Sequence, residues 1–208
     1  FDFVYIIGDA YVDHPSFGIS LTARVLESEG LRVAMLPQPR LDTDKDFTRF
    51  GRPKLAFFVT SGNIDSMVNN YTVAKKKRSE DVYSPNGKAG GRPDRAVIWY
   101  CRKIREIYGD IPIIIGGLEA SLRRFAHYDY WDDEVRPSIL ADSGADLLIY
   151  GMGEHQTREI ARGLSEGKKP SELHDIRGIC YFDNLNTEIP NSVSCASFDH
   201  VKADKRTY

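Results

Sequence analysis

Residues 111–133 read IPIIIGGLEASLRRFAHYDYWDD, and this stretch decides the fold. A short run of apolar, mostly β-branched residues ends at Gly116-Gly117 and is followed by a helical pattern. This order is typical of a buried parallel strand that delivers a loop to the edge of a sheet, where α/β folds bind ligands. The aromatic and acidic residues at 127–133 are too polar for a core and too aromatic for a solvated linker. We expect them to form a surface that contacts another molecule or domain.

The same alternation of strand and helix patterns repeats along the chain. Further strands are predicted by apolar runs at 3–8, 33–36, 55–59, 147–150 and 178–182. Helices are predicted by the spacing of apolar residues at 18–30, 63–74, 97–108, 136–143 and 157–164. Such alternation favours a mostly parallel sheet with helices on both faces. We predict a Rossmann-like or flavodoxin-like α/β domain over 1–167, then a connecting segment over 168–208 with one strand and a small C-terminal β appendage.

One segment departs from this pattern. Residues 75–95 (KKKRSEDVYSPNGKAGGRPDR) contain seven basic and three acidic residues, with Pro and Gly throughout. Such a composition predicts a mobile insertion without a packed element. Two interpretations stay open, a solvated loop and a lid or anion-contacting loop.

Composition excludes several classes of protein. The 208 residues are 41% hydrophobic, which is enough for a substantial core. The net charge of −2 does not indicate binding to nucleic acid or to an acidic membrane surface. No apolar run approaches the roughly 18 residues of a membrane span, and no signal peptide is present, so we expect a cytoplasmic protein. The chain begins at Phe1 without Met and ends in KADKRTY, which suggests a piece of a longer protein.

Several common site motifs are absent from the sequence. No G-x-G-x-x-G follows the first strand, and neither a P-loop nor a G-x-S-x-G elbow occurs. Cys101, Cys180 and Cys195 are widely separated, without C-x-x-C spacing, and are predicted to be reduced thiols rather than metal ligands. NAD-type, P-loop and hydrolase-elbow chemistry are therefore not supported.

The candidate functional residues lie where predicted strands end, because doubly wound sheets bind ligands at that edge. Gly116 and Gly117 either let a ligand approach the backbone or form a tight turn. Asp13-His14 either binds a metal or transfers a proton, or it bonds locally within its loop. Glu154 either bonds the hydroxyls of a ligand or complements the positive end of its helix.

Three stretches resemble a known family. Residues 2–30 (DFVYIIGDAYVDHPSFGISLTARVLESEG), 111–140 (IPIIIGGLEASLRRFAHYDYWDDEVRPSIL) and 144–154 (GADLLIYGMGE) look like the N-terminal part of the YgiQ family of radical SAM proteins. In such proteins this part is similar to a cobalamin-binding, Rossmann-like domain that precedes a radical SAM barrel. For the full protein the resemblance implies a [4Fe–4S] cluster, S-adenosylmethionine and, as a further candidate, cobalamin. The barrel of the same chain is the implied partner.

The resemblance also implies a set of residues around a cofactor or small ligand. They are Asp9, Tyr11, Asp13, His14, Gly18, Thr60, Ser61, Gly116, Gly117, Glu119, Gly151, Gly153 and Glu154. Two family features are missing, the C-x₃-C-x₂-C cluster motif and the D-x-H-x-x-G of cobalt-ligating loops. We therefore expect no iron–sulfur cluster in this chain and no histidine ligation of cobalamin.

These observations together predict a non-catalytic accessory domain that shields or positions a cofactor or substrate of a radical SAM enzyme. Two alternatives stay open. One is a stand-alone small-molecule enzyme that uses Asp9, Asp13 and His14. The other is an interaction domain that docks through the surface from Tyr128 to Trp131.

Overall fold

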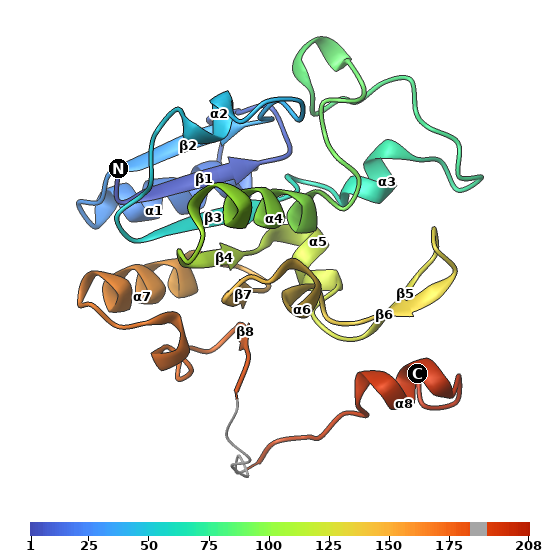
Figure 1. Ribbon diagram of the computed structural model, residues 1–208. Coiled ribbons are helices and arrows are strands. Elements are labelled where there is room, and N and C mark those ends of the chain that lie inside the picture. The colour runs from blue at the N-terminus through green and yellow to red at the C-terminus, as the bar shows by residue number, and fades with distance from the viewer. Residues whose placement is uncertain (184–190) are drawn as a thin grey trace.

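A six-stranded sheet forms the centre of the computed structural model, with strand order β2-β1-β3-β4-β7-β8 (Figure 1). The strands are β1 (Phe3–Ile7), β2 (Val33–Pro37), β3 (Ala56–Thr60), β4 (Ile113–Ile115), β7 (Leu147–Ile149) and β8 (Ile179–Tyr181). The first five in this order run parallel, whereas β8 is antiparallel to β7. The structure describes residues 1–183 and 191–208, so residues 184–190 of the predicted connecting segment lie outside the described residues.

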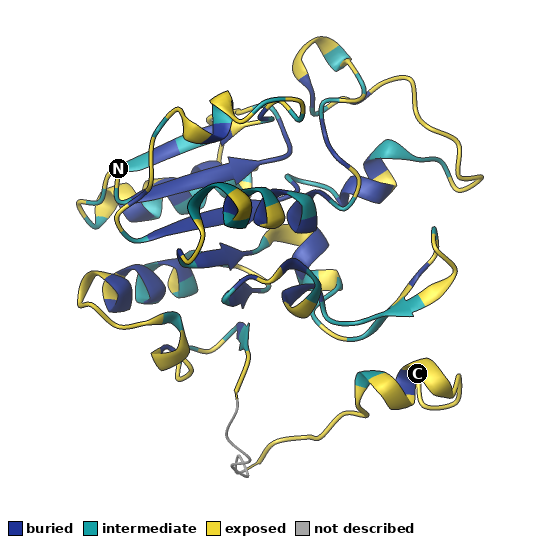
Figure 2. Cartoon of the chain, in the orientation of Figure 1, coloured by how far each residue is buried: buried dark blue, intermediate teal, exposed yellow. Residues whose placement is uncertain are grey.

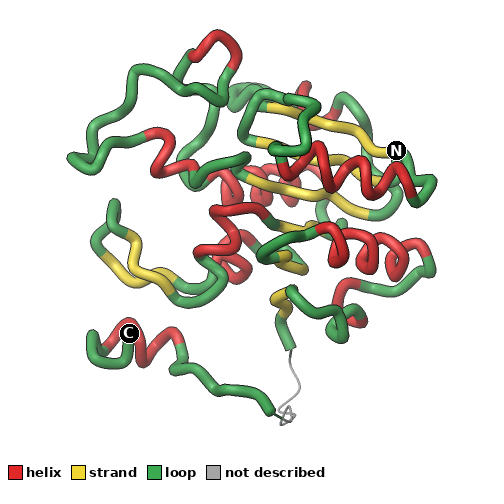
Figure 3. Tube along the Cα trace, turned by 180° about the vertical axis from the view of Figure 1, so that it is seen from behind, coloured by secondary structure: helices red, strands yellow, loops and turns green. Residues whose placement is uncertain are grey.

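Helices cover both faces of the sheet, as the strand–helix alternation predicted. On one face lie α1 (Gly18–Ser28) and α7 (Glu154–Ser165), and on the other lie α4 (Ala96–Tyr108) and α6 (Ile139–Ser143). Figure 3 shows the sheet from behind, with the helices of both layers around it. The central strands are buried along their whole length, which explains why their apolar runs do not alternate with polar residues (Figure 2).

The remaining elements are short. They are α2 (Lys45–Thr48), α3 (Ser66–Asn70), the 3₁₀ turns η1 (Pro85–Gly87) and η2 (Pro170–Glu172), α5 (Gly117–Leu122), α8 (Phe198–Ala203), and the antiparallel hairpin of β5 (His127–Asp129) and β6 (Glu134–Arg136). Helix α8 packs against β6 (Figure 1). No helix in the described part of the chain has the length and apolar character needed to cross a membrane.

Two predicted helices are shorter than expected, for local reasons. The helix predicted at 63–74 is α3, which Asp65 caps by accepting bonds from the N–H groups of Met67 and Val68. It ends at Tyr71, whose backbone is extended and bridges to Lys77. The helix predicted at 136–143 begins only at Ile139, because residues 134–136 form strand β6. The predicted C-terminal strand is β8, which joins the main sheet, and the chain after the gap forms helix α8.

The insertion at 75–95 is packed against the domain more closely than its composition indicated. Asp81, Ser84 and Arg92 are buried, and the Arg92 residue is only 2% exposed. A buried ion pair therefore packs part of the insertion against the domain, which its composition did not indicate, while the 3₁₀ turn η1 is the only helical element within these described residues. Its mobility stays a prediction, and Figure 2 shows that most of its length is exposed.

Strand register determines where the loops meet. Ile7 at the end of β1 pairs with Thr60 at the end of β3, and Val59 pairs with Ile115 at the end of β4. Ile115 in turn pairs with Leu148 of β7. Four parallel strands thus end side by side, and the loops that follow them meet at one edge of the sheet.

Candidate functional site

A cavity of about 240 Å³ lies at this edge, and we call it the carboxyl-edge cavity. Its wall contains the ends of four strands, at Ile7, Thr60, Ile115 and Ile149. The beginnings of α1, α5 and α7 complete the wall. The geometry is that of a ligand site in an open α/β sheet, beyond the carboxyl ends of the strands.

The structure brings many of the sequence-predicted residues together around this cavity. Lining residues from the predicted set are Asp9, Gly18, Thr60, Gly116, Gly117, Gly151 and Gly153. Most of them are glycines, so backbone rather than side chain forms much of the wall. Their assignment as cofactor-binding residues stays a prediction, but their common location agrees with it.

Other predicted residues lie elsewhere. Tyr11, Asp13 and His14 are exposed on the first loop and do not line the cavity. Asp13 pairs with Arg24, with 2.7 Å between Oδ2 and Nη2, and the Nδ1 atom of His14 accepts a bond from the Ser16 N–H at 3.1 Å. Asp13 and His14 therefore make local contacts, which agrees with the second of the two interpretations, bonding within or beside their own loop.

The three groups named for a stand-alone enzyme differ in their surroundings. Asp9 is 1% exposed and paired inside the domain, whereas Asp13 and His14 face solvent. The structure therefore does not assemble them into one acid–base or metal site. Across the described residues, no group of three or more His, Cys, Asp or Glu side chains is placed to hold a metal ion.

Ser61 and Glu154 are also outside the cavity wall. Ser61 is fully buried and donates its hydroxyl proton to the carbonyl of Ile64 at 2.9 Å. Glu154 is the first residue of α7, where its carboxylate complements the positive end of the helix.

Glu119 has a structural position that its sequence context did not reveal. Its side chain is fully buried, and it accepts bonds from the N–H groups of Ser66 at 2.8 Å and Val97 at 3.1 Å. These groups belong to the first turns of α3 and α4, so one carboxylate from α5 ties two helix N-termini together. Burial raises the pKa of Glu119, and the nearby negative charge of Asp65 raises it further. The positive charge of Arg123 lowers the pKa but does not offset these two effects.

Asp9 connects the cavity to the insertion. Its carboxylate lies 2.6 Å from Nη2 of Arg92 and accepts a bond of 2.6 Å from the N–H of Asn63. Arg92 also contacts Asp81 at 3.4 Å and donates to the carbonyl of Ser61. Burial raises the pKa of Asp9, and these partners only partly offset that effect.

Gly117 is required by the turn itself. Its φ of +83° lies in the region that favours glycine, and an added Cβ would stand 2.3 Å from Oγ1 of Thr60. Gly116 has an extended backbone, and an added Cβ would meet the carbonyl of Ile149 at 3.4 Å. The turn interpretation thus holds for Gly117, while Gly116 has room for a small side chain.

Sequence reasoning missed the deep wall of the cavity. Tyr5, Thr22, Phe58 and Thr157 line it, from two strands and from the two helices on that face. The Tyr5 hydroxyl is buried beside the two threonines and makes no hydrogen bond of normal geometry, and burial raises its pKa. A threonine on the sheet-facing side of each helix, half-buried at Thr22 and buried at Thr157, is the signal that sequence reading could have used.

Exposed apolar side chains follow three of the strands that end at the cavity; Leu118 lines it, and Met152 lies between the lining residues Gly151 and Gly153. Val12 is 42% exposed, Leu118 is 45% exposed and Met152 is 80% exposed. Val12 and Met152 lie on the loops after β1 and β7, and Leu118 lies in the first turn of α5 after β4. Apolar residues gathered around a cavity are typical of a surface covered by another domain.

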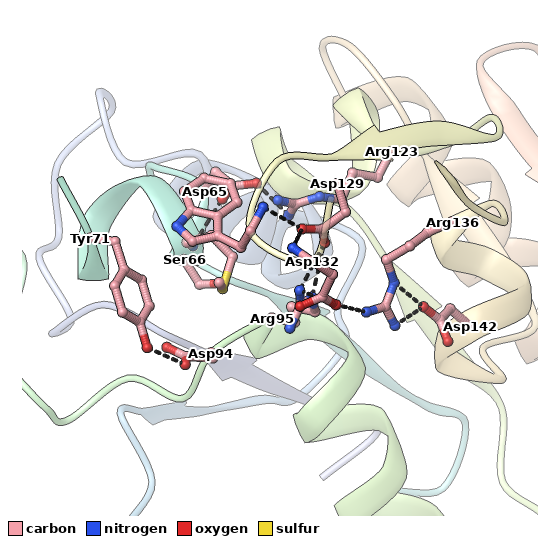
Figure 4. A network of polar contacts seen from close by, with 12 residues as sticks. Asp65, Ser66, Tyr71, Asp94, Arg95, Arg123, Asp129, Asp132, Arg136 and Asp142 are labelled. Atoms are coloured by element: carbon pink, nitrogen blue, oxygen red, sulfur yellow. Dashed lines mark hydrogen bonds and ion pairs between the residues drawn. The ribbon is translucent and has the colours of Figure 1, made fainter. Parts of the chain in front are cut away.

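The aromatic and acidic stretch at 127–133 packs against the insertion within the domain. Arg95 pairs with Asp129 at 3.0 Å and with Asp132 at 2.6 Å, and Asp132 in turn pairs with Arg136 (Figure 4). The hydroxyl of Tyr130 donates to the Val73 carbonyl at 2.7 Å. Part of the surface predicted for docking is thus used inside the chain, and docking through it stays a prediction.

Comparison with known proteins agrees with this architecture. The family model described as "Radical SAM N-terminal" matches residues 1–208. The chain belongs to the radical SAM N-terminal family. A UPF0313 protein of Clostridium botulinum is 54% identical over 207 residues, covering 100% of this chain and 32% of the relative. A UPF0313 protein of Clostridium perfringens is 53% identical over 208 residues, covering 100% of this chain and 31% of the relative.

This radical SAM N-terminal chain therefore spans about a third of the length of the curated relatives it matches. Among solved structures it is similar to the radical S-adenosylmethionine methyltransferase TsrM from Kitasatospora setae, solved with tryptophan and an S-adenosylmethionine analogue bound. The TM-score is 0.55 at 18% identity, and the match covers 88% of this chain and 29% of TsrM. At this identity the likeness shows the α/β fold alone.

Proposed function

We propose that this chain is the N-terminal accessory domain of a YgiQ-type radical SAM enzyme, and that its carboxyl-edge cavity shields or positions part of a cofactor or substrate. The full protein would hold the [4Fe–4S] cluster and S-adenosylmethionine in its remaining part and cleave S-adenosylmethionine reductively to a carbon radical. Three scattered cysteines in this chain cannot supply the thiolates of such a cluster. A cytoplasmic location stays part of the proposal.

The single observation that carries the proposal is the cavity with its apolar rim. A volume of about 240 Å³ lies below the roughly 300–1,000 Å³ of complete small-molecule pockets. The cavity therefore accommodates one end of a ligand, and the rest of that ligand needs a second wall. The exposed side chains of Val12, Leu118 and Met152 are placed to contact that second wall, which we assign to the barrel of the longer protein.

Cobalamin is the specific cofactor that the family resemblance implies, and the cavity fits part of it. When bound, cobalamin supplies a cobalt centre for methyl or radical chemistry. The residues that would hold it are the glycine backbone at 116–117 and 151–153, with the buried hydroxyls of Tyr5 and Thr157 deep in the cavity. No histidine lines the cavity, so the chain's described residues offer no imidazole ligand to the metal.

The test uses the full-length protein, reconstituted anaerobically with iron and sulfide and titrated with hydroxocobalamin. Thr22→Leu adds bulk at the cavity, and Thr48→Leu is its matched control. Both threonines donate to carbonyls three and four residues earlier, at 3.2 and 3.0 Å for Thr22 and at 3.3 and 3.0 Å for Thr48. Thr48 is exposed and does not line the cavity.

We expect saturable spectral change in the wild type and in Thr48→Leu. In Thr22→Leu the affinity should fall about tenfold, because overpacking a filled site costs about 1–3 kcal/mol. Equal affinities of the two variants would place binding outside the cavity. Absence of any cobalamin spectrum would refute cobalamin and direct the same titration to S-adenosylmethionine.

A further inference from the structure

A second cavity, of about 350 Å³, lies beneath the insertion, and we call it the insertion cavity. Leu41 and Trp99 are its large apolar lining residues. The remaining lining residues come from α3 and from residues 77–94, and most of them are polar or charged. This cavity is separate from the carboxyl-edge cavity, and none of its lining residues lines the other.

The two carboxylates of the insertion cavity already have partners. Asp81 accepts bonds from the Tyr83 N–H at 2.9 Å and the Ser84 hydroxyl at 2.8 Å. Burial opposes its ionisation, but these bonds and Arg92 outweigh burial and lower its pKa. Asp94 accepts from Asn70 at 2.9 Å and from the hydroxyl of Tyr71 at 2.6 Å (Figure 4). Both carboxylates therefore already have hydrogen-bond donors.

The donors of the same cavity are not saturated. Nε of Arg92 is buried without an acceptor, and Nδ2 of Asn69 makes no hydrogen bond of normal geometry, although Asn69 is close enough to Asp81 to help lower the pKa of that carboxyl. These residues are 2% and 8% exposed, so water has little access to them. Among the described residues, neither Lys77 nor Arg78 has an ion-pair partner. Of the side-chain nitrogens of these two residues, only Nε of Arg78 donates a hydrogen bond, and it contacts two backbone carbonyls. A buried donor without an acceptor costs stability, and a bound acceptor removes that cost.

We propose that the insertion cavity is a binding site for a small molecule that carries a phosphate or carboxylate group. The anionic oxygens would accept from Asn69, Arg92, Lys77 and Arg78, while the body of the ligand rests against Trp99. The charges agree, since three cationic and two acidic side chains line the cavity and both acids are already paired. An oxygen-rich anion is the ligand class that satisfies four donors at once.

The experiment titrates the full-length protein with inorganic phosphate and with succinate by isothermal titration calorimetry, at ionic strength held constant with sodium chloride. Lys77→Gln removes a lining charge, and Lys76→Gln is its control, because Lys76 has the same exposure and charge but does not line the cavity. Asn69→Leu removes a buried donor at similar side-chain volume. Its folding is monitored separately by thermal unfolding.

We expect one of the two anions to bind the wild type, which identifies the group as phosphate or carboxylate. Lys77→Gln should weaken that binding about tenfold or more, as expected for a hydrogen bond to a charged group, while Lys76→Gln keeps wild-type affinity. Asn69→Leu should lose binding and keep its melting temperature, since an unsatisfied donor is removed. Equal losses in both lysine variants, or no heat from either anion up to about 10 mM, would overturn the proposal.

Discussion

Replacement of Glu119 tests whether one buried carboxylate organises three helices. In Glu119→Gln the side chain keeps a single acceptor oxygen and gains an amide donor. One of the two helix N–H groups, on Ser66 or Val97, then loses its acceptor and faces that donor. We expect a loss of unfolding free energy of about 1–3 kcal/mol, the cost of one buried unsatisfied donor.

Glu119→Ala removes both acceptors and also changes the charge balance with Arg123 and Asp65. Arg123 lies 3.8 Å from the Glu119 carboxylate and pairs more closely with Asp65. Breaking a buried charge cluster costs about 3–5 kcal/mol. We therefore expect Glu119→Ala to lose more unfolding free energy than Glu119→Gln. In a domain of this size each 1 kcal/mol lowers the melting temperature by roughly 2–4 °C.

The assay is urea unfolding of the chain followed by far-ultraviolet circular dichroism. Glu80→Gln is the control. Glu80 is exposed, so this substitution makes the same change of charge at the surface without removing a buried acceptor. The urea concentration at the unfolding midpoint should be highest for the Glu80→Gln control, lower for Glu119→Gln and lowest for Glu119→Ala. The dependence of unfolding free energy on urea concentration should be the same in all three. If the glutamine variant unfolds together with the control, Glu119 does not clamp the helices and the reasoning fails.

The pH dependence provides a second measurement on the same variant. The folded pKa of Glu119 is raised above its ordinary value of 4.5, so the unfolded chain releases this proton at lower pH than the folded chain. The stability from this group is therefore full below about pH 4.5 and declines as pH rises through the folded pKa. The difference between wild type and Glu119→Gln should shrink over that range. A difference that grows with pH would mean that Arg123 outweighs burial.

Three further predictions concern the turn, the buried arginine and the insertion. Gly117→Ala should lower unfolding free energy by about 1–3 kcal/mol, because its φ is positive, whereas Gly116→Ala should cost less; thermal unfolding of both variants checks this order. Arg92→Met should cost about 3–5 kcal/mol in urea unfolding, since it leaves two buried carboxylates without their cation. Limited trypsin digestion followed by mass spectrometry should show first cuts within 75–78 and none at Arg95, which is paired with Asp129 and Asp132 and precedes buried Ala96; early cutting at Arg95 would contradict the packing of the insertion.

The sheet could be predicted from sequence because its strands are buried on both faces. A run such as Ile113–Ile115 has no polar residue to interrupt it, and a positive-φ glycine follows closely at Gly117. Short elements could not be predicted in this way. The hairpin of β5 and β6 contains three residues in each strand, and cross-strand pairing and Arg95 stabilise it rather than an apolar pattern.

The candidate site was predictable in part, for the same reason. Glycines at strand ends mark the edge of the sheet, and the structure places Gly116, Gly151 and Gly153 around one cavity. Glu119 was wrongly grouped with them, because sequence gives its position in the chain but not the side to which a helix turns it. Its carboxylate points to α3 and α4 and not into the cavity.

The pair of Asp9 and Arg92 joins the two proposed sites into one electrostatic system. Asp9 lines the carboxyl-edge cavity and Arg92 lines the insertion cavity, and 2.6 Å separates their charged atoms. An anion bound at the proposed insertion-cavity site would share the Arg92 guanidinium with Asp9, and this would weaken the interaction that favours ionised Asp9. Because burial already raises the pKa of Asp9, the loss of that partner raises it further and moves Asp9 toward its neutral form. If the proposed anion site exists, its occupancy would therefore change the charge on the wall of the carboxyl-edge cavity.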